Sequence, residues 1–340
     1  MKVREKIGHI LDRARDRQRI SQEEATVLMG IDERSHEMYA LMSTANRMTR
    51  EQFSDTAEIF AQVGINNGPC PKNCKFCFFG EAWGQIREPL ELSAEQVVFR
   101  VKEFEKAGAN AVLLMTTANY PFDKYIEIGR EVRKALGPGM PLCANIGDIG
   151  PAEVRRLEEA GFTSANHTFR LREGTDTCID VTTRKKTLEA IRDSGLALTS
   201  CLEPIGPEHS NEEILDLMFF AVRECRPTLF STMNRVPVPG TPFGDRGTIS
   251  KMKLAKVTAV ARIVCCDDIE NFSVHPPSSV TLASGANSVA AEVGANPRDT
   301  AEETSKGIGL SVEVCKRILQ DADYKILKGF SKAFAKPNKP

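Results

Sequence analysis

The chain has 340 residues, of which 41% are hydrophobic and 27% are charged, and its formal net charge is −1. A chain of this length and composition can bury a large core and is typical of globular proteins rather than of low-complexity or disordered ones. The near-neutral charge gives no global reason to expect nucleic acid or an anionic membrane as a partner. We therefore expect any recognition of charged molecules to depend on local groups.

The first twenty residues mix charged and apolar side chains throughout. They contain no apolar run of the length that a signal peptide or a membrane span needs, so we expect a cytoplasmic protein. The chain has ten cysteines. In a reducing compartment these are not expected to form a disulfide framework, and a tight group of them indicates metal or redox chemistry.

We expect residues 1–56 to form a helical extension that caps the N-terminal side of the main domain. After it, the pattern of a helix, a glycine and then a strand recurs along the chain. Ser93 and Gln96 have the spacing of a capping box, and their helix is expected to end at Gly108 before the apolar run AVLLMTT. Pro151 stands at a first helical position, and that helix is expected to end at Gly161.

Eight strands alternate with helices in this pattern, which predicts a (β/α)8 barrel of the TIM type. The predicted strands are Ala57–Ile65, Ala111–Thr117, Leu142–Ile146, Thr163–Phe169, Ala197–Glu203, Leu229–Val236, Asn271–Val274 and Ser288–Val293. A doubly wound open sheet is the alternative, but no Gly-x-Gly-x-x-Gly turn follows the first strand. The barrel is expected to span residues 57–325, with a basic C-terminal tail at 326–340.

Three cysteines, Cys70, Cys74 and Cys77, follow the first strand in the segment GPCPKNCKFCFFG. On a barrel this position lies at the C-terminal face, where barrel enzymes keep their active sites. Thiolates bind iron–sulfur clusters, and a four-iron cluster normally takes four cysteines. Three cysteines would leave one iron open, as catalytic zinc keeps one position open. A zinc site completed by a distant cysteine or histidine, and cysteines that serve only packing, are the alternatives.

The Cys-x-x-x-Cys-x-x-Cys spacing, with Phe76 directly before the last cysteine, resembles the signature of the radical S-adenosylmethionine (SAM) enzymes. The resemblance implies that Cys70, Cys74 and Cys77 are the catalytic and metal-binding residues and hold a 4Fe-4S cluster. It also implies that SAM binds the fourth iron through its amine and carboxylate. One electron would then cleave SAM to methionine and a 5′-deoxyadenosyl radical, which takes hydrogen from the substrate.

The resemblance extends to biotin synthase and its relatives over about Ile59 to Pro297. The motifs NHTF at 166–169, TTR at 182–184, PGTP at 239–242 and GANS at 285–288 fall in that family's order. The cofactor-binding residues that the resemblance implies are Phe76, Thr116, Asn166, Thr168, Arg184 and Ile205. Among them Arg184 would pair with the methionyl carboxylate, a charge-assisted contact that suits arginine.

The same resemblance places two of these residues, Asn166 and Thr168, near the ribose of SAM and Ile205 near the adenine. Arg170 stands where the family usually has an acidic residue. The loop that contains it is a candidate for substrate binding, although a solvated loop uses such residues too. His167 is a candidate ligand or proton donor, and a buried, hydrogen-bonded histidine is the alternative.

Biotin synthase has a second cluster held by three cysteines and an arginine. Cys143 falls at one of these positions and Cys201 lies near another, whereas the strand at AVLLMTT has no cysteine and His275 is the nearest candidate for the arginine. The second cluster of biotin synthase is therefore not intact. A different second iron–sulfur site would use Cys143 and Cys201, with Cys178 or His275. Packing alone also explains buried cysteines inside a barrel.

These observations predict a radical SAM enzyme that abstracts hydrogen from an aliphatic C–H bond for sulfur insertion, as in biotin synthase or the two-protein lipoyl synthases. Carbon-skeleton rearrangement of the methylornithine synthase type is an alternative, and a non-catalytic iron–sulfur or zinc scaffold is an alternative of another class. The expected partners are a small-molecule or carrier-protein-bound aliphatic substrate and an electron donor such as ferredoxin or flavodoxin. Neither nucleic acid nor a membrane is expected as a partner.

Overall fold

The structure is a computed structural model that describes residues 3–299 and 309–335. Eight parallel strands follow one another around a sheet in which β1 pairs with both β2 and β8, so the sheet closes into a barrel. The strands are β1 (Thr56–Gly64), β2 (Ala111–Met115), β3 (Leu142–Asn145), β4 (Ser164–Asn166), β5 (Ala197–Ile205), β6 (Leu229–Asn234), β7 (Asn271–His275) and β8 (Ser288–Gly294). The predicted (β/α)8 barrel is confirmed, and the open sheet is excluded.

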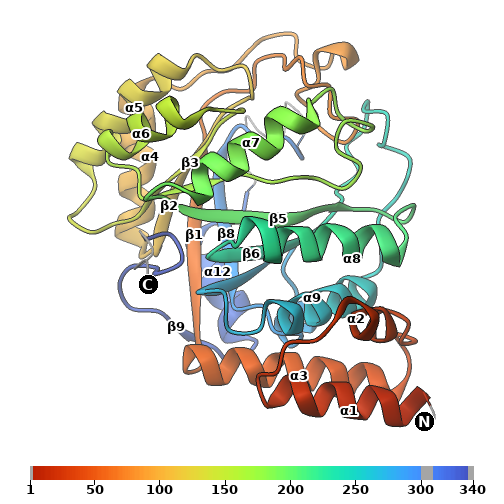
Figure 1. Ribbon diagram of the computed structural model, residues 1–340. Coiled ribbons are helices and arrows are strands. Elements are labelled where there is room, and N and C mark those ends of the chain that lie inside the picture. Colours follow the sequence, from red (N-terminus) through yellow and green to blue (C-terminus); the bar gives the residue numbers. More distant parts are fainter. Residues whose placement is uncertain (1–2, 300–308, 336–340) are drawn as a thin grey trace.

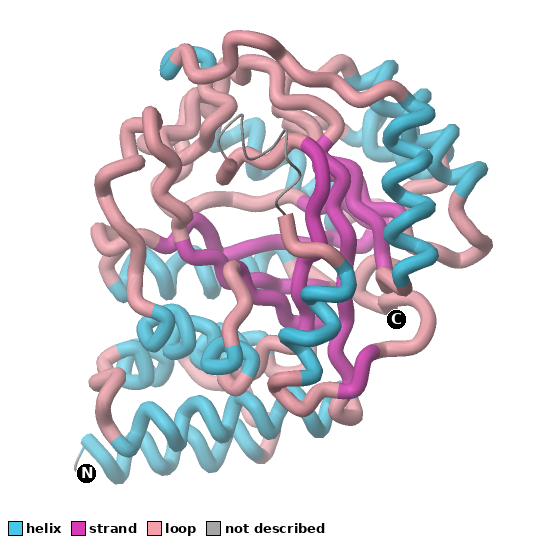
Figure 2. Tube along the Cα trace, turned by 180° about the vertical axis from the view of Figure 1, so that it is seen from behind, coloured by secondary structure: helices cyan, strands magenta, loops and turns pink. Residues whose placement is uncertain are grey.

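Helices lie outside the strands in both views of the molecule (Figures 1 and 2). They are α4 (Ala94–Ala107), α5 (Phe122–Ala135), α6 (Pro151–Glu159), α7 (Val181–Arg192), α8 (Asn211–Phe220), α9 (Lys251–Cys265), α10 (Ser279–Leu282) and α12 (Val312–Gln320). A 3-10 helix covers Glu81–Trp83 and a π-helical turn covers Ala221–Cys225. No helix of the described residues is long and apolar enough to cross a membrane.

The predicted helix ends are found where the capping chemistry puts them. Ser93 caps α4 and forms the capping box with Gln96, and Gly108 ends the helix in the left-handed region at φ 90°. Pro151 is the first residue of α6, and Gly161 follows the helix at φ 88°. These local signals set where each helix ends. The chain can therefore turn there and return to the barrel as the next strand.

The N-terminal segment folds into α1 (Val3–Arg15), α2 (Gln22–Met29) and α3 (His36–Phe53). Figure 1 shows α1 and α3 crossing the lower edge of the molecule, beneath α9. The side chain of Gln52 donates to the carbonyl of Ile269, just before β7, and Thr49 donates to the carbonyl of Gly285. The extension therefore packs against the barrel's side and reaches the N-terminal ends of β7 and β8.

The last described residues close the inside of the barrel at its N-terminal end. The ring of Phe334 lies 5.3 Å from that of Phe60 on β1, and the carbonyl of Phe334 accepts a hydrogen bond from Thr163 at 2.6 Å. A short strand β9 (Lys325–Ile326) leads into this segment. Residues 331–335 of the expected C-terminal tail thus form a plug, and residues 336–340 lie outside the described part.

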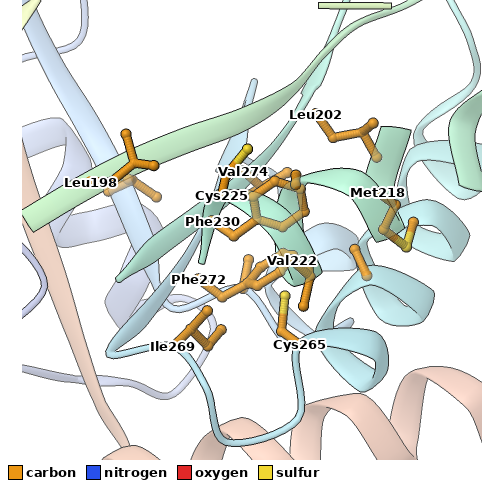
Figure 3. Packing of buried hydrophobic residues seen from close by; sticks show 14 of the residues in the cluster. Leu198, Leu202, Met218, Val222, Cys225, Phe230, Cys265, Ile269, Phe272 and Val274 are labelled. Carbon is orange, nitrogen blue, oxygen red and sulfur yellow. The ribbon is translucent and has the colours of Figure 1, made fainter. Parts of the chain in front are cut away.

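Two sets of buried apolar residues build the core. The larger set fills the layer between strands and helices, and Figure 3 shows part of it, where Phe230 and Phe272 of β6 and β7 meet Met218 and Cys265 of α8 and α9. The smaller set includes Leu113, Cys143, Leu229 and Phe334 inside the barrel, and also Cys70, Phe78 and Phe79 in the segment that follows β1. Apolar side chains therefore lie beside the plug and also support the segment after β1.

Candidate active site

The cysteine loop, residues 68–80, follows β1 at the C-terminal end of the barrel. The backbone N–H of Cys70 donates to the carbonyl of Phe79 at 2.7 Å, and the N–H of Cys77 donates to the carbonyl of Cys74 at 2.8 Å. Because the two ends of the loop are bonded to each other, the three cysteines are held within one compact turn. The carbonyl of Cys70 also accepts from the N–H of Glu81 at 3.1 Å, which fixes the exit of the loop.

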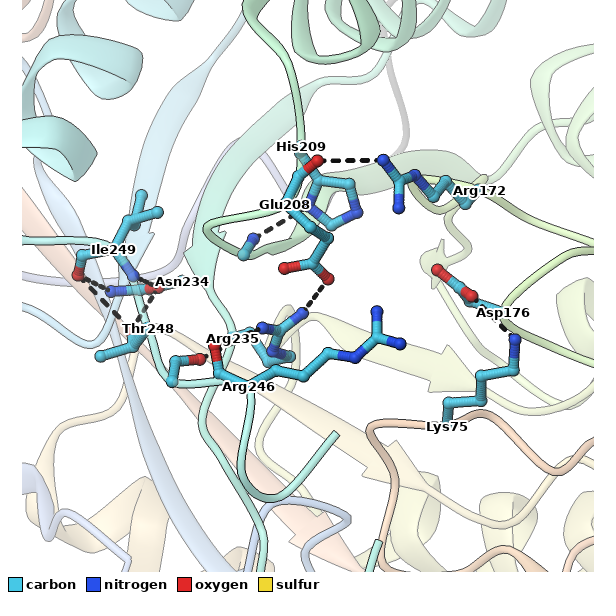
Figure 4. Close-up of polar contacts among 12 residues, drawn as sticks. Lys75, Arg172, Asp176, Glu208, His209, Asn234, Arg235, Arg246, Thr248 and Ile249 are labelled. Atoms are coloured by element: carbon cyan, nitrogen blue, oxygen red, sulfur yellow. Dashed lines mark hydrogen bonds and ion pairs between the residues drawn. The ribbon is translucent and has the colours of Figure 1, made fainter. Parts of the chain in front are cut away.

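A second loop, residues 170–180 after β4, holds the cysteine loop from the side. The N–H of Lys75 donates to the carbonyl of Asp176 at 2.9 Å, and the N–H of Cys178 donates to the carbonyl of Lys72 at 2.7 Å. The Nζ atom of Lys75 lies 3.0 Å from Oδ1 of Asp176, as Figure 4 shows. These contacts fix the position of the cysteines relative to β4 and the start of α7.

The three cysteines line one cavity of about 200 Å³ at the C-terminal mouth of the barrel, which we call the cysteine cavity. Five of the six predicted cofactor-binding residues also line it, namely Phe76, Thr116, Asn166, Thr168 and Arg184. The sixth, Ile205, is buried at the end of β5, next to Asn234 of β6, and is not among the lining residues. The fold therefore brings these five residues, from the segments after β1 and β2 and from β4 to α7, around the cysteines.

The donor set suits an iron–sulfur cluster. Burial raises the pKa of Cys74 to about 12 and raises that of Cys77 as well. Thiols of this kind lose their proton when a metal binds. The N–H of Phe79 points at Sγ of Cys77, 3.4 Å away, a type of hydrogen bond that tunes cluster sulfurs.

The described residues contain no group of three histidine, cysteine or carboxylate side chains close enough to share a single metal ion. A four-iron cluster has a different requirement, because each cysteine binds its own iron and the thiolates surround the cluster rather than one point.

Arg184, near the start of α7, forms a buried polar centre on the wall of the cysteine cavity. Its Nε atom lies 2.9 Å from Oδ1 of Asp148, and its Nη1 atom donates to the carbonyl of Thr168 at 3.1 Å. His167 Nε2 donates to the same Asp148 oxygen at 3.2 Å. Burial and the charge of Arg184 lower the pKa of His167 to about 4, so the imidazole is neutral near pH 7.

Two buried oxygens in this region have no hydrogen-bond partner among the described residues. They are Oγ1 of Thr116, which lines the cysteine cavity, and Oδ2 of Asp148, which is bonded to the lining residues Arg184 and His167 but does not line the cavity itself. Buried polar atoms are nearly always hydrogen-bonded, so the orphaned hydroxyl of Thr116 at the cavity indicates a polar ligand. The amine, ribose and carboxylate of SAM supply groups of this kind. The wall therefore suits the cofactor that the cysteine spacing implies.

Asp148 is a site residue that sequence reasoning missed. It lies in the loop NIGDIG after β3, and a single acid in a short loop gives no signal of its own. Glu203 and Glu292 were missed too, although each is the one charged residue of its strand and lies at a position that points into the barrel. An inward charge in a barrel strand is a usable signal, because buried charges need partners.

Two arginines of the loop after β4 lie in different surroundings, one at the cysteine cavity and one near the surface. Arg170 lines the cysteine cavity, and its Nε atom lies 3.0 Å from Oε1 of Glu203. Arg172 turns away and pairs with Glu213 at 2.7 Å, and its Nη2 atom donates to the carbonyl of Glu208 (Figure 4). Of these two arginines, Arg170 lines the cysteine cavity and Arg172 does not.

The residues predicted for a second cluster are spread over different surroundings. Cys143 is fully buried among apolar residues, with Sγ 4.0 Å from Oγ1 of Thr199. Cys201 and His275 line a second cavity deeper in the barrel, and Cys178 is exposed on the outer loop. A second cluster at these residues stays a prediction. Cys201 and His275 line the same cavity, but neither Cys143 nor Cys178 lines it with them.

The chain is similar to known proteins in sequence and in structure. It is 28% identical to the biotin synthase of Saccharopolyspora erythraea over 241 residues, which cover 68% of this chain and 67% of that one. The crystal structure of methylornithine synthase (PylB) superposes with a TM-score of 0.76 at 16% identity, covering 94% of this chain and 97% of that one.

The FeFe-hydrogenase maturase HydG from Carboxydothermus hydrogenoformans superposes with a TM-score of 0.79 at 17% identity, over 97% of this chain and 82% of that one. At these identities the two structures show the shared fold alone. The model of the family described as the Radical SAM superfamily matches residues 68–240, just over half of the chain, and includes the cysteine loop and Arg184. The chain therefore belongs to the radical SAM superfamily.

Proposed function

We propose that this protein cleaves SAM reductively and that the resulting radical takes a hydrogen atom from an aliphatic C–H bond of a substrate held inside the barrel. The observation that carries the proposal is the cysteine cavity, which Cys70, Cys74 and Cys77 line together with Arg184 and the orphaned oxygen of Thr116. When bound, a 4Fe-4S cluster and SAM would supply the electron and the 5′-deoxyadenosyl radical.

The residues of the cavity wall would bind and orient the cofactor. Arg184 offers a guanidinium to the methionyl carboxylate, and Asp148 would hold that guanidinium in place through Oδ1. His167 is neutral near pH 7, so it adds no competing positive charge beside Arg184. Asn166 and Thr168 extend this wall from β4 to the loop that follows it.

Sulfur insertion is the first candidate for the step after hydrogen abstraction. The sequence similarity to biotin synthase supports it, and Cys201 faces the interior of the barrel as a sulfur donor or a cluster ligand would. Carbon-skeleton rearrangement is the second candidate. A specific observation favours it, because Cys143 is packed among apolar residues and does not line the deeper cavity with Cys201 and His275.

The proposal includes an electron donor, such as ferredoxin or flavodoxin, and an aliphatic substrate. A non-catalytic iron–sulfur or zinc scaffold would explain the cysteine loop. It would not require the polar residues Arg184 and Asp148 beside that loop, whereas a SAM-binding enzyme would. The scaffold and the enzyme differ in metal content and in chemistry, so one experiment separates them.

The test is anaerobic reconstitution with iron and sulfide, followed by incubation with SAM and a strong reductant. We expect about four irons per reconstituted site and the release of 5′-deoxyadenosine and methionine. A protein that retains zinc only, or that holds a cluster without cleaving SAM, would contradict the proposal. Iron and sulfide are then counted in the variant with Cys70, Cys74 and Cys77 all changed to alanine. Residual cluster would support sulfur insertion, and its absence would support rearrangement.

A further inference from the structure

A second cavity of about 90 Å³ continues from the cysteine cavity toward the plug, and we call it the inner chamber. The two cavities share five lining residues: Gln62, Asn166, Glu203, Met233 and Arg298. This ring of shared residues is the boundary between the space proposed for SAM and the space beyond it. A molecule in the inner chamber would therefore meet the cofactor at this ring.

The floor of the inner chamber is apolar, with Phe60, Leu113, Leu229 and Phe334. Its side walls carry hydrogen-bonding groups from three adjacent strands, namely Thr199 of β5, Ser231 of β6, and Ser273 and His275 of β7. Burial and the charge of Arg298 lower the pKa of His275 to about 4, so its ring is neutral near pH 7. These wall groups are polar and uncharged near pH 7, and Glu292, the carboxylate that lines the inner chamber outside the ring, is paired with Arg298.

The ring itself carries charges of both signs. Glu203 is held by Arg170 at 3.0 Å, and Arg298 bonds to Glu292 through Nη2 and to Sδ of Met233 through Nη1, at 3.5 Å. Burial works against the charge of Arg298, but the carboxylates of Glu292 and Glu203 raise the pKa of this guanidinium. Glu203 and Arg298 therefore lie close enough to interact, and both border the inner chamber.

We propose that the inner chamber binds a small amino acid as a zwitterion, with its ammonium beside Glu203 and its carboxylate beside Arg298. The inference rests on the proposed function and names its substrate class. The side chain of the amino acid extends past the hydroxyls of Ser231 and Ser273 toward the apolar floor. The carbon atoms next to the two charged groups are then the ones that face the cysteine cavity.

An aliphatic acyl chain fits the inner chamber poorly. It would remove water from Glu203, Arg298, His275 and the wall hydroxyls without replacing the lost hydrogen bonds, which opposes binding. A zwitterion brings one positive and one negative group to a ring that already has both signs. The volume of the inner chamber agrees with a small amino acid. A cavity volume of about 10–15 Å³ accommodates one water molecule, so the 90 Å³ of the inner chamber suits a molecule of few heavy atoms.

The test measures binding without turnover. Anaerobically reconstituted protein with SAM and no reductant is dialysed to equilibrium against an equimolar mixture of the twenty protein amino acids and octanamide, and the retained compounds are identified by mass spectrometry. We expect one or a few amino acids to be retained, and no octanamide. Retention of octanamide alone, or of nothing, would overturn the inference.

Variants then locate the binding. Arg298→Gln and Glu203→Gln should each weaken retention of the bound amino acid at least tenfold, and Arg298→Lys should restore part of it. Ser231→Leu fills the inner chamber without changing its charges, so it should abolish retention even where a charge variant folds poorly. Glu213→Gln, whose carboxylate pairs with Arg172 outside both cavities, is the matched control and should retain the amino acid as the unmodified protein does.

Two failures can be told apart. If the protein cleaves SAM under reductant and retains no amino acid, the inference is wrong and the proposed function stands. If it does not cleave SAM, the proposed function is wrong whatever the dialysis shows. Equal retention by the Ser231→Leu variant and the unmodified protein would place the amino acid outside the inner chamber and overturn the inference as well.

Discussion

Arg170 and Glu203 form a partly buried ion pair at the boundary of the two cavities, with Nε of the arginine 3.0 Å from Oε1 of the glutamate. Burial opposes the charge of Arg170, but Glu203 and Glu173 raise the pKa of its guanidinium above the usual value. Arg170 lies on the loop after β4 and Glu203 lies on β5, so the pair joins two neighbouring units of the barrel. The pair thus contributes both to the shape of the site and to its charge balance.

Arg170→Gln is therefore expected to destabilise the protein. Removing one partner of a fully buried ion pair typically costs about 3–5 kcal/mol, and because this pair is partly exposed we expect a loss between that range and the value for a surface pair. Denaturant unfolding of the cluster-free protein measures the loss. Arg172→Gln is the matched control, since Arg172 pairs with Glu213 near the surface and such pairs contribute about 1 kcal/mol or less. Equal losses in the two variants would show that the Arg170–Glu203 pair has no special role in stability.

Alanine at Cys70, Cys74 or Cys77 is expected to abolish SAM cleavage while the protein stays folded. The cysteines lie in the loop after β1, whose ends are held by backbone hydrogen bonds, and not in a barrel strand, so we expect the barrel to fold without their thiol groups. Production of 5′-deoxyadenosine and the iron content are measured together with circular dichroism.

Cys225→Ala is the control for the cysteine variants, because Cys225 packs among Val222, Phe230 and other apolar residues near α8 and α9 (Figure 3). It should keep its iron and its cleavage rate. Cleavage that persists in all three loop variants would show that the loop does not hold the catalytic cluster.

Arg184→Ala is expected to weaken SAM binding. A lost hydrogen bond to a charged group typically costs about 1.5–3 kcal/mol, which is roughly a ten- to hundredfold rise in the dissociation constant. Equilibrium dialysis with the reconstituted protein measures it, and the absorption spectrum of the cluster should change little. Arg192→Ala, at the outer end of the same helix, is the control. An unchanged dissociation constant for the Arg184 variant would remove this residue from the cofactor site.

The barrel could be predicted from the sequence because its signals are local. Ser93, Gln96 and Gly108 set the ends of one helix by capping chemistry alone, and β-branched and apolar runs between such helices mark the strands. Each strand prediction overlaps an observed strand. The cysteine loop was also predictable, since three metal-binding side chains lie within eight positions of one another.

The rest of the site depends on contacts between distant parts of the chain. Asp148 meets Arg184 and His167 only after β3, β4 and α7 are packed side by side. The plug is a similar case, because Phe334 reaches Phe60 from the other end of the sequence. Spacing along the chain has no information about either contact. The inward position of Glu203 could be inferred from strand alternation, but its partner Arg170 could not.

Glu58, near the start of β1, has a pH-dependent effect on stability. Burial raises its pKa to about 7 from an ordinary value of 4.5, while Ser331 and Asn271 oppose the shift weakly, and its Oε2 atom has no hydrogen-bond partner among the described residues. A raised pKa means that the folded protein keeps this proton between pH 4.5 and 7, whereas the unfolded chain has lost it. The unfolded state then binds fewer protons, so stability falls as the pH rises through this range.

Glu58→Gln removes this titration and keeps the shape of the side chain. Each pH unit between the two pKa values corresponds to about 1.4 kcal/mol, so between pH 5 and pH 8 the variant should gain about 2–3 kcal/mol relative to the unmodified protein. His167 and His275, whose pKa values are lowered to about 4, add an opposite slope below pH 6.5. That slope is common to both proteins and cancels in the comparison.

The measurement is denaturant unfolding at pH 5, 6, 7 and 8, and the quantity compared is the difference between the two proteins at each pH. Glu127→Gln, exposed on α5, is the control and should follow the unmodified protein at every pH. A constant difference between the Glu58 variant and the unmodified protein would mean that the Glu58 carboxyl ionises in the folded state as it does in the unfolded one. The plug at Ser331 would then leave this side chain in contact with water.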